Sequence, residues 1–125
     1  MKTTVALTGA SGAMGSEVLK SLLLSEKELI VRCLMHRGGN KLPKFVRKTV
    51  KKNKARIEFI EGSLTDKECC KKLVDGADYV IHCGSVIPPK ADHDGEKAIR
   101  VNYGGTVNII EGIKECGGLE KTALV

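Results

Sequence analysis

Two periodicities of apolar and polar residues alternate along the chain. Short apolar runs rich in β-branched residues predict strands, and longer segments with apolar residues three and four positions apart predict helices. Strands are expected at 2–7, 29–35, 57–60, 79–83 and 121–125. Helices are expected from 12 to the polar stretch at 25–27, and at 41–54, 65–74 and 95–116. Each strand but the last is therefore followed by a helix.

The predicted strands are apolar on both faces, as Val5-Ala6-Leu7 illustrates. This is typical of parallel strands that helices cover on both sides. Right-handed crossovers then give an α/β, doubly wound parallel sheet with the expected strand order 3-2-1-4-5. The length of 125 residues fits one domain over 1–125, and no internal repeat or low-complexity linker divides it.

Residue types near the helix ends place the helices more closely. In the first helix, Met14, Val18 and Leu22 are spaced by four with Leu19 and Leu23 beside them, and these residues predict its apolar side. Pro43 fits only the first turn of the helix at 41–54, because proline lacks the N–H that an interior turn needs.

The third helix carries its own start and stop residues. Thr65 or Asp66 can cap its beginning, and Gly76 can end it. In the last helix, Asn102 falls on one stripe with Gly105 and Ile109, and this stripe is expected to face the sheet.

The charge of the chain is uneven. The net charge is +6, yet residues 37–56 contain nine Lys/Arg and no Asp/Glu, so the remainder is slightly acidic. Two interpretations stay open for this segment: the solvated face of an amphipathic helix, or a patch that attracts an anionic ligand. Specific binding of nucleic acid is not expected, because aromatic residues make up only 3% and Trp is absent.

Cysteine and histidine usage points to a reducing compartment without a metal site. The five cysteines are an odd number without a Cys-x-x-Cys pair, so free thiols in the cytoplasm are expected. The three histidines do not combine with them in a zinc spacing. Of the adjacent Cys69 and Cys70, one should be packed and one partly exposed. Neither a signal peptide nor an apolar run long enough to span a membrane is present.

The strongest motif lies between the first strand and the first helix. It is Gly9-Ala10-Ser11-Gly12-Ala13-Met14-Gly15. Gly9 permits a tight turn, Gly12 lets the backbone approach a pyrophosphate, and Gly15 lets the helix pack closely on the sheet. The N–H groups at the helix start face the phosphates, and the Ser11 hydroxyl adds a donor. The alternative is a purely structural glycine-rich turn.

The spacing Gly-x-x-Gly-x-x-Gly is one residue longer than the common dinucleotide fingerprint. With it, the chain resembles the extended branch of the short-chain dehydrogenase/reductase superfamily, which includes sugar-nucleotide epimerases, dihydroflavonol-type reductases and 3β-hydroxysteroid dehydrogenases. The resemblance covers the whole chain, and it rests also on the stretches at 59–66, 75–85 and 101–106. It implies a Rossmann-like fold and a nicotinamide dinucleotide cofactor.

The second strand ends at Met35-His36-Arg37, where NAD-dependent enzymes usually carry an acidic residue for the ribose hydroxyls. Arg37 can instead pair with a 2′-phosphate in a forked geometry, and Lys41 can add a second charge. The sequence therefore predicts NADP, with NAD as the less favoured cofactor. The alternative is that Arg37 only solubilises a loop.

The resemblance implies three further parts of the cofactor site. Ser63-Leu64 stands where the family has an Asp-Leu or Asp-Val pair beside the adenine, so Ser63 departs from the pattern. The alternative for Ser63 is a plain turn before the helix cap at Thr65 or Asp66. Cys83-Gly84-Ser85 is the small-residue turn that runs beneath the cofactor ribose. Cys83 has no evident base beside it and is expected to be a buried structural thiol, with His82 a packed strand residue. Asn102 matches an asparagine that orders backbone and water near the active site, and a locally satisfied structural role is the alternative.

The superfamily's catalytic Ser and Tyr-x-x-x-Lys do not occur in this chain, because Tyr79 is followed by Cys83 and Tyr103 by Val107 at that spacing. No catalytic residue is therefore assigned. The sequence is expected to be the N-terminal, NADP(H)-binding part of a longer reductase or epimerase that transfers hydride to or from a carbonyl or hydroxyl carbon, and to be inactive alone. The rival interpretation is a non-catalytic NADP-sensing regulator of the same fold. The substrate and the oligomeric state stay open, and an oligomer is possible.

Overall fold

The computed structural model describes residues 2–35, 42–84 and 95–116, and the backbone of 121–124. Within these ranges the strands are β1 (Thr3–Thr8), β2 (Leu29–Met35), β3 (Ile57–Glu61), β4 (Tyr79–His82) and β5 (Lys121–Leu124). The helices are α1 (Ala13–Leu24), α2 (Lys44–Lys52), α3 (Lys67–Val74), α5 (Gly95–Ile99) and α6 (Gly105–Glu115). A 3₁₀ turn η1 (Lys54–Arg56) precedes β3, and a π-helical segment η2 (Arg100–Gly104) joins α5 to α6.

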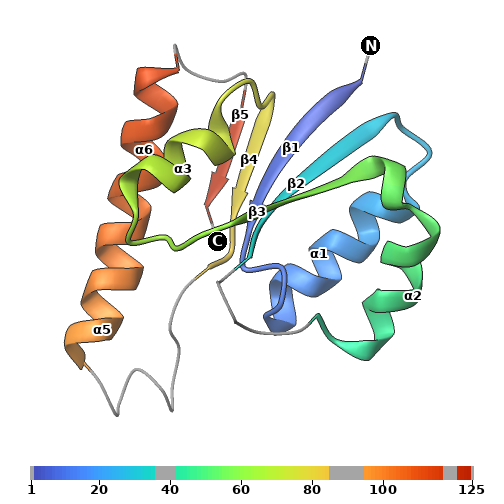
Figure 1. The fold of residues 1–125 in the computed structure, drawn as a ribbon, viewed down its shortest axis with the longest axis horizontal. Helices are drawn as coiled ribbons and strands as arrows, with labels where there is room; N and C mark the ends of the chain where they lie inside the picture. The colour runs from blue at the N-terminus through green and yellow to red at the C-terminus, as the bar shows by residue number, and fades with distance from the viewer. Residues whose placement is uncertain (1, 36–41, 85–94, 117–120, 125) are drawn as a thin grey trace.

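The strands form one parallel sheet in the order β3-β2-β1-β4-β5 (Figure 1). The register sets Val5 of β1 between Val31 of β2 and Tyr79 of β4. All four pairings are parallel, so the carboxyl ends of the strands meet at one edge. The predicted doubly wound sheet and its strand order are confirmed.

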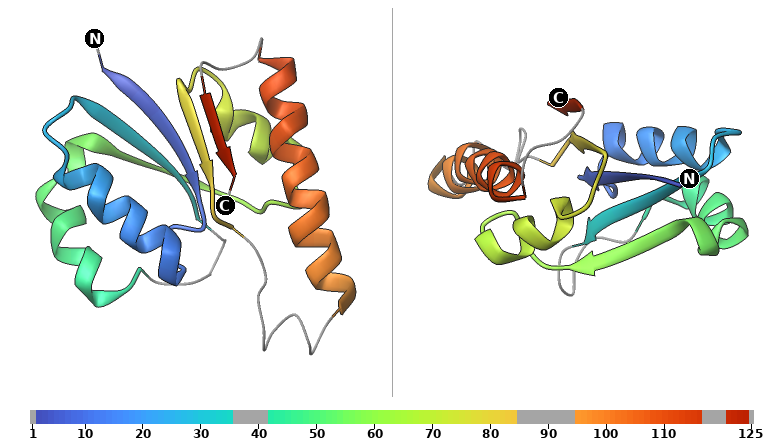
Figure 2. Two further views of the ribbon diagram at one scale, coloured as in Figure 1. Left: turned by 180° about the vertical axis from the view of Figure 1, so that it is seen from behind. Right: turned by 90° about the horizontal axis from the view of Figure 1, so that it is seen from above.

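The sheet separates two apolar clusters, one on each face. On one face the strand residues Ala6, Leu34 and Val80 pack against α3 and α6, chiefly through Leu73 and Ile109. On the other face the strand residues pack against α1 and α2, and this cluster includes Leu7, Val31, Cys33, Leu19 and Val46. Figure 2 shows the two helix pairs on opposite sides of the sheet. Successive residues of one strand therefore serve different cores, which is why the strands are apolar on both faces.

Helix α1 packs on the sheet through part of its predicted apolar side. Leu19 and Leu23 are buried, Val18 and Leu22 are partly buried against the same core, and Met14 is 56% exposed. The closest contact is at Gly15, where an added Cβ would stand only 1.8 Å from the Gly9 carbonyl oxygen. Only a residue without a side chain can lie this close to the turn at Gly9, so the position of Gly15 fixes the rotation of α1 about its axis.

The basic helix is shorter than predicted. It begins at Lys44 with Pro43 at the N-cap, one position before the first turn, and it ends at Lys52. The Asn53 amide donates to the Thr49 carbonyl at 2.8 Å, and the chain then enters η1. The Arg56 guanidinium donates to carbonyl oxygens of the α1–β2 connection. The accepting residues are Leu23, Ser25, Lys27 and Leu29. Arg56, one of the nine basic residues in segment 37–56, thus has a structural role, because its hydrogen bonds fix the α1–β2 connection.

Several strand boundaries differ by one residue, since β1 is shifted to Thr3–Thr8, β3 ends at Glu61 rather than Ile60, and β4 ends at His82 rather than Cys83. Of the two candidate caps for the third helix, Asp66 is the one used, because its carboxylate accepts the N–H groups of Glu68 and Cys69. The Cys69 thiol also donates to this carboxylate, and these bonds lower the pKa of Asp66. As predicted for the cysteine pair, Cys70 is buried and Cys69 is partly exposed.

The packing of α1 on the glycine turn generates a stability prediction. Gly15→Ala should lower the free energy of unfolding by roughly 1–3 kcal/mol, because its Cβ would overlap backbone atoms that have no room to move. Gly104→Ala is the matched control, since an added Cβ there meets nothing within 4 Å. The control should be neutral or stabilised by up to about 1 kcal/mol through its higher helix propensity. Urea unfolding of both variants checks this, and equal stabilities would contradict it.

Candidate functional site

The predicted site residues that the structure describes gather at the carboxyl edge of the sheet. The turn after β1 carries Gly9, Ser11 and Gly12, and the first turn of α1 carries Ala13 and Met14. Cys83 and Gly84 follow β4, which pairs directly with β1. Ser63 and Leu64 follow β3. Ligands of doubly wound sheets bind outside this edge.

Close backbone contact joins the glycine turn to the end of β4. Gly9 has φ +77°, a left-handed conformation that residues with a side chain rarely adopt. An added Cβ there would lie 2.7 Å from both the Cys83 carbonyl carbon and the Gly84 nitrogen. Gly9 is therefore required twice, for its conformation and for this contact.

Gly12 is exposed and has room around it. It forms the N-cap of α1, and its N–H donates to the Gly9 carbonyl at 3.0 Å. An added Cβ would meet only the Gly9 carbonyl oxygen, at an ordinary 3.4 Å. No side chain caps the N-terminus of α1, and its first turn holds no acidic residue. The helix start thus leaves main-chain N–H groups and a positive dipole end available to an anion.

Leu64 connects the third strand to the same edge. An added Cβ on Gly84 would lie 2.8 Å from Leu64 Cδ1, and one on Gly105 would lie 3.0 Å from Leu64 Cβ. The Asn108 amide of α6 donates to the Leu64 carbonyl at 2.8 Å. Sequence analysis did not single out Asn108, whose only signal is an amide beside the buried Ile109. Gly84 and Gly105 leave room for Leu64 between the end of β4 and α6, and the hydrogen bond from Asn108 fixes it there.

Ser63 is engaged in a local turn. Its hydroxyl lies 2.8 Å from that of Thr65 and accepts the Thr65 N–H at 3.2 Å. This is the plain turn that was the alternative to an adenine contact. The hydroxyl still lies at the surface, since Ser63 is only partly buried. A role of Ser63 toward adenine stays a prediction.

The thiols are poorly suited to nucleophilic attack. Cys83 is partly buried, and burial raises the pKa of its thiol. Burial also raises the pKa of Cys33 to about 12, which keeps that thiol protonated. A thiol reacts as the thiolate, so raised pKa values disfavour reaction at both positions. Cys83 was expected to be buried, whereas the structure buries it only partly, and its structural role stays a prediction.

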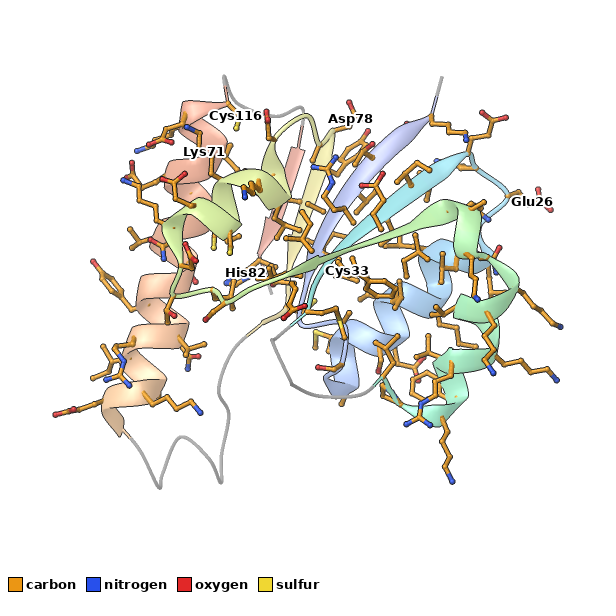
Figure 3. All side chains as sticks on the ribbon, in the orientation of Figure 1. Glu26, Cys33, Lys71, Asp78, His82 and Cys116 are labelled. Atoms are coloured by element: carbon orange, nitrogen blue, oxygen red, sulfur yellow. The ribbon has the colours of Figure 1, made fainter. Side chains whose placement is uncertain are left out.

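His82 is packed inside the protein, as predicted, and it joins three elements (Figure 3). Nδ1 lies 2.6 Å from the Thr8 hydroxyl of β1, and Nε2 lies 3.1 Å from the Thr106 hydroxyl of α6. Thr8 also accepts the Gly84 N–H at 2.9 Å. Thr8 precedes the glycine turn and Thr106 closes the stretch 101–106, but the sequence assigned no role to either hydroxyl, because a threonine at the end of a strand or in a helix carries no signal of its partner. Burial lowers the pKa of His82.

The helix asparagine lies where the chain departs from regular α-helix. Asn102 is partly buried in the π-helical segment η2, and its carbonyl accepts the Thr106 hydroxyl proton at 2.7 Å. Gly105 and Ile109 of the predicted stripe are buried, which confirms the face that α6 presents to the sheet. The predicted single helix is thus interrupted at 100–104, and π-helical turns of this kind occur frequently at functional sites.

Three predicted cofactor contacts lie outside the described residues. They are Arg37, Lys41 and Ser85. The loop 86–94, expected to border the substrate, lies outside them as well. The prediction of NADP, which depends on Arg37, is therefore untested by the fold. Among the residues that are described, no group of three or more His, Cys, Asp or Glu side chains is arranged to hold a metal ion.

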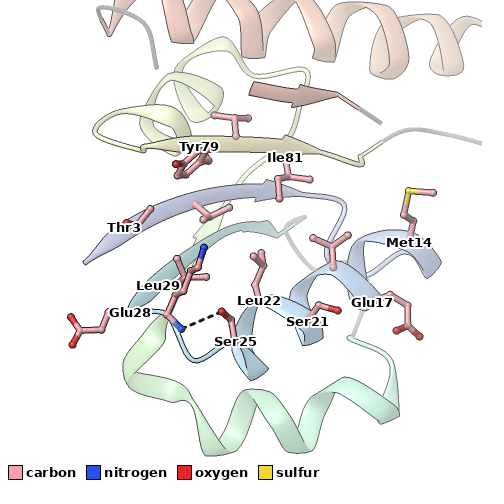
Figure 4. A pocket seen from close by; sticks show the side chains of 14 residues that line it. Thr3, Met14, Glu17, Ser21, Leu22, Ser25, Glu28, Leu29, Tyr79 and Ile81 are labelled. Atoms are coloured by element: carbon pink, nitrogen blue, oxygen red, sulfur yellow. Dashed lines mark hydrogen bonds between the residues drawn. The ribbon is translucent and has the colours of Figure 1, made fainter. Parts of the chain in front are cut away.

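A groove runs along the flank of α1 and shares Met14 with this edge (Figure 4). It has a volume of about 1270 Å³ and lies over β1 and β4. Its apolar lining includes Val18, Leu22, Tyr79 and Ile81. Met14 therefore borders this groove rather than the core, while Val18 and Leu22 contact both. In the part of the chain that the structure describes, no helix is long and apolar enough to cross a bilayer.

The fold and the glycine turn together define a Rossmann-like α/β protein. A family comparison matches residues 5–124 to the NAD-dependent epimerase/dehydratase family, and the chain belongs to that family. The resemblance to the extended short-chain dehydrogenase/reductases is thereby confirmed at the level of the family.

Individual relatives share part of the sequence or the fold. The chain is 39% identical over 62 residues to a decarboxylating sterol-4-alpha-carboxylate 3-dehydrogenase of Bos taurus, covering 50% of this chain and 17% of that protein. The structure of Pen from Bacillus thuringiensis superposes with a TM-score of 0.83 at 18% identity, over 98% of this chain and 37% of Pen. UDP-glucose 4-epimerase from Bifidobacterium longum, solved with NAD+ and UDP, gives 0.79 at 17% identity, over 98% and 36%. The chain thus spans well under half the length of these proteins.

The buried imidazole predicts a pH dependence of stability. An unfolded histidine titrates near about 6.5, whereas burial lowers the pKa of His82 in the folded state. As the pH falls through about 6.5, the unfolded chain takes up a proton that the folded chain refuses, so acid favours unfolding. The contribution is complete above about pH 7 and declines below it by at most about 1.4 kcal/mol per pH unit.

Urea unfolding between pH 7.5 and 5.5 measures this contribution. The wild-type free energy of unfolding should fall over that range, and His82→Asn should have a shallower slope because Asn does not titrate. The difference between the two slopes isolates His82 from every other group. Parallel slopes would contradict the prediction.

Proposed function

We propose that this chain binds a nicotinamide dinucleotide at the carboxyl edge of its sheet. The observation that carries the proposal is the cradle at Gly12. It is an exposed helix start without a side-chain cap. The space above the turn is open because Gly12 has no side chain. Gly9 and Gly15 hold this turn in place from below. A pyrophosphate fits such a start because both the N–H groups and the dipole favour negative charge.

The other residues at the edge are proposed to bind the rest of the cofactor. The N–H groups of Ala13 and Met14 and the Ser11 hydroxyl face the phosphates. Cys83 and Gly84 run beneath the ribose, where Gly84 brings its backbone close. Ser63 and Leu64 border the adenine. In this arrangement most contacts come from the main chain, so small residues matter more than particular functional groups.

The bound nicotinamide would supply the hydride, and this chain's residues would bind and orient it. We propose a carbonyl or hydroxyl carbon of a small molecule as the reacting group in the whole protein. The family description and the bovine relative, named as a 3-dehydrogenase, support this class of substrate. The proton-transfer pair Tyr-x-x-x-Lys does not occur in these 125 residues, so the chain by itself is proposed to bind cofactor without turnover.

The second candidate function is a non-catalytic sensor of the cofactor, favoured by the same lack of Tyr-x-x-x-Lys. Both candidates bind the dinucleotide, and they differ in turnover by the polypeptide that the gene encodes. Oxidation of NADPH or NADH with a panel of aldehydes and ketones separates them. We also propose that the protein acts in a reducing, cytoplasmic compartment, because its five cysteines are free thiols.

The cradle is tested by Gly12→Val. A branched side chain should stand where the pyrophosphate lies, and cofactor affinity in calorimetry should fall at least about tenfold, the loss of about 1.4 kcal/mol. The fold should survive, because Gly12 has φ −80° and its Cβ would make only an ordinary contact. Gly12→Ala should show a smaller loss. Unchanged cofactor affinity in Gly12→Val, with an intact thermal unfolding transition, would show that the cofactor does not bind at this turn.

The cofactor choice is tested at Arg37. We propose that Arg37 pairs with a 2′-phosphate and selects NADPH, against the alternative of NAD, which is bound in the Bifidobacterium structure. Arg37→Ala should weaken NADPH binding roughly ten- to a hundredfold, because one charge-assisted hydrogen bond is worth about 1.5–3 kcal/mol. NADH binding should change little. Equal losses for both cofactors, or tighter binding of NADH by the wild type, would assign the chain to NAD.

A further inference from the structure

The imidazole of His82 lies at the centre of a continuous chain of hydrogen bonds. It is 4% exposed, and both of its ring nitrogens have hydroxyl partners. A neutral imidazole has one donor and one acceptor nitrogen. The partners on either side decide which nitrogen carries the proton.

The helix side fixes the proton on Nε2. The Thr106 hydroxyl has a single proton, and it donates this proton to the Asn102 carbonyl at 2.7 Å. A carbonyl only accepts, so this direction has no alternative. The contact of 3.1 Å between Thr106 Oγ1 and His82 Nε2 must then be donated by the ring.

The strand side agrees with this assignment. The Gly84 N–H donates to Thr8 Oγ1 at 2.9 Å, which uses an acceptor position of that hydroxyl. The Thr8 proton is then directed to His82 Nδ1, 2.6 Å away. The bonds run in one direction, from Gly84 through Thr8, His82 and Thr106 to Asn102.

This series of hydrogen bonds begins and ends in two segments on which the proposed cofactor site depends. Gly84 belongs to the turn that touches Gly9, where the backbones approach too closely for a side chain. Asn102 belongs to η2, where the helix departs from α geometry. No other described residue bonds to both Thr8 and Thr106. A change in the ring's proton arrangement would therefore be felt at both ends.

We propose that His82, held as the neutral Nε2–H tautomer, is a positioning residue for the dinucleotide site. Through Thr8 it fixes the Gly84 turn, and through Thr106 it fixes the Asn102 segment. A ring protonated on Nδ1 would direct a second donor at Thr8 Oγ1 and force the Thr8 proton toward a new acceptor. The positioning role rests on the proposed function, whereas the tautomer does not.

The tautomer is tested by nitrogen NMR of the ¹⁵N-histidine-labelled chain at pH 7.5, without cofactor. The chain has three histidines, and His82→Asn identifies the His82 signals. The expected pattern is a protonated Nε2 and an unprotonated Nδ1. A protonated Nδ1, or the averaged shifts of a mixture of tautomers, would overturn the proposal.

The positioning role is tested by Thr106→Val, with Thr106→Ser as its matched control. Val keeps the shape and removes the hydroxyl, so Nε2–H loses its acceptor, whereas Ser restores it. Thr106→Val should mix the tautomers, speed amide exchange at Gly84, and weaken binding of NADPH or NADH about two- to tenfold, the equivalent of one hydrogen bond. Thr106→Ser should resemble the wild type in all three.

The outcomes separate the two proposals. If Thr106→Ser behaves like Thr106→Val, or if Gly84 exchange and affinity are unchanged in Thr106→Val, Thr106 acts through packing and the positioning role is wrong. If the wild type binds neither NADPH nor NADH, the proposed function fails and the positioning role fails with it. The NMR pattern still decides the tautomer in that case.

Discussion

The backbone contact between the first turn and the end of β4 is the constraint on which the other features of this edge depend. A Cβ added to Gly9 would lie 2.7 Å from the backbone of Cys83 and Gly84, so no side chain fits between the two segments. The same turn presses its carbonyl against Gly15, which sets the rotation of α1. Gly84 in turn leaves space for Leu64 and offers its N–H to Thr8. Without this contact, the start of α1, the turn after β4 and the hydrogen bonds of His82 would lose the backbone packing that they share.

The sequence was sufficient for the features that local chemistry decides. Short strands apolar on both faces allow few arrangements other than a helix-covered parallel sheet, and Gly9 and Gly15 mark positions where only glycine fits. The apolar pattern of α1 included Leu19 and Leu23, which are buried, but it gave the same weight to Met14, which is 56% exposed. Periodicity alone does not show which edge of an apolar stripe meets the core.

Features that depend on a distant partner were not predictable. Arg56 looked like one more charge in a basic segment, but it clamps carbonyls about thirty residues earlier in the chain. Asn108 and Thr106 are ordinary helix residues until α6 packs beside Leu64 and His82. The π-helical turn at 100–104 was not predicted either, because the apolar spacing of 95–116 fits one continuous helix. Packing rather than propensity decides these roles.

The apolar groove beside α1 makes the colloidal behaviour of the chain depend on salt. Leu22, Tyr79 and Ile81 present a surface that gains free energy by leaving water, while the net charge of +6 keeps copies of the chain apart. The repulsion reaches about 30 Å at 0.01 M ionic strength but only about 10 Å at 0.1 M. The free energy gained by covering apolar surface has no such dependence at these concentrations. A dilute buffer thus keeps the molecules apart, and at physiological salt this repulsion is largely screened.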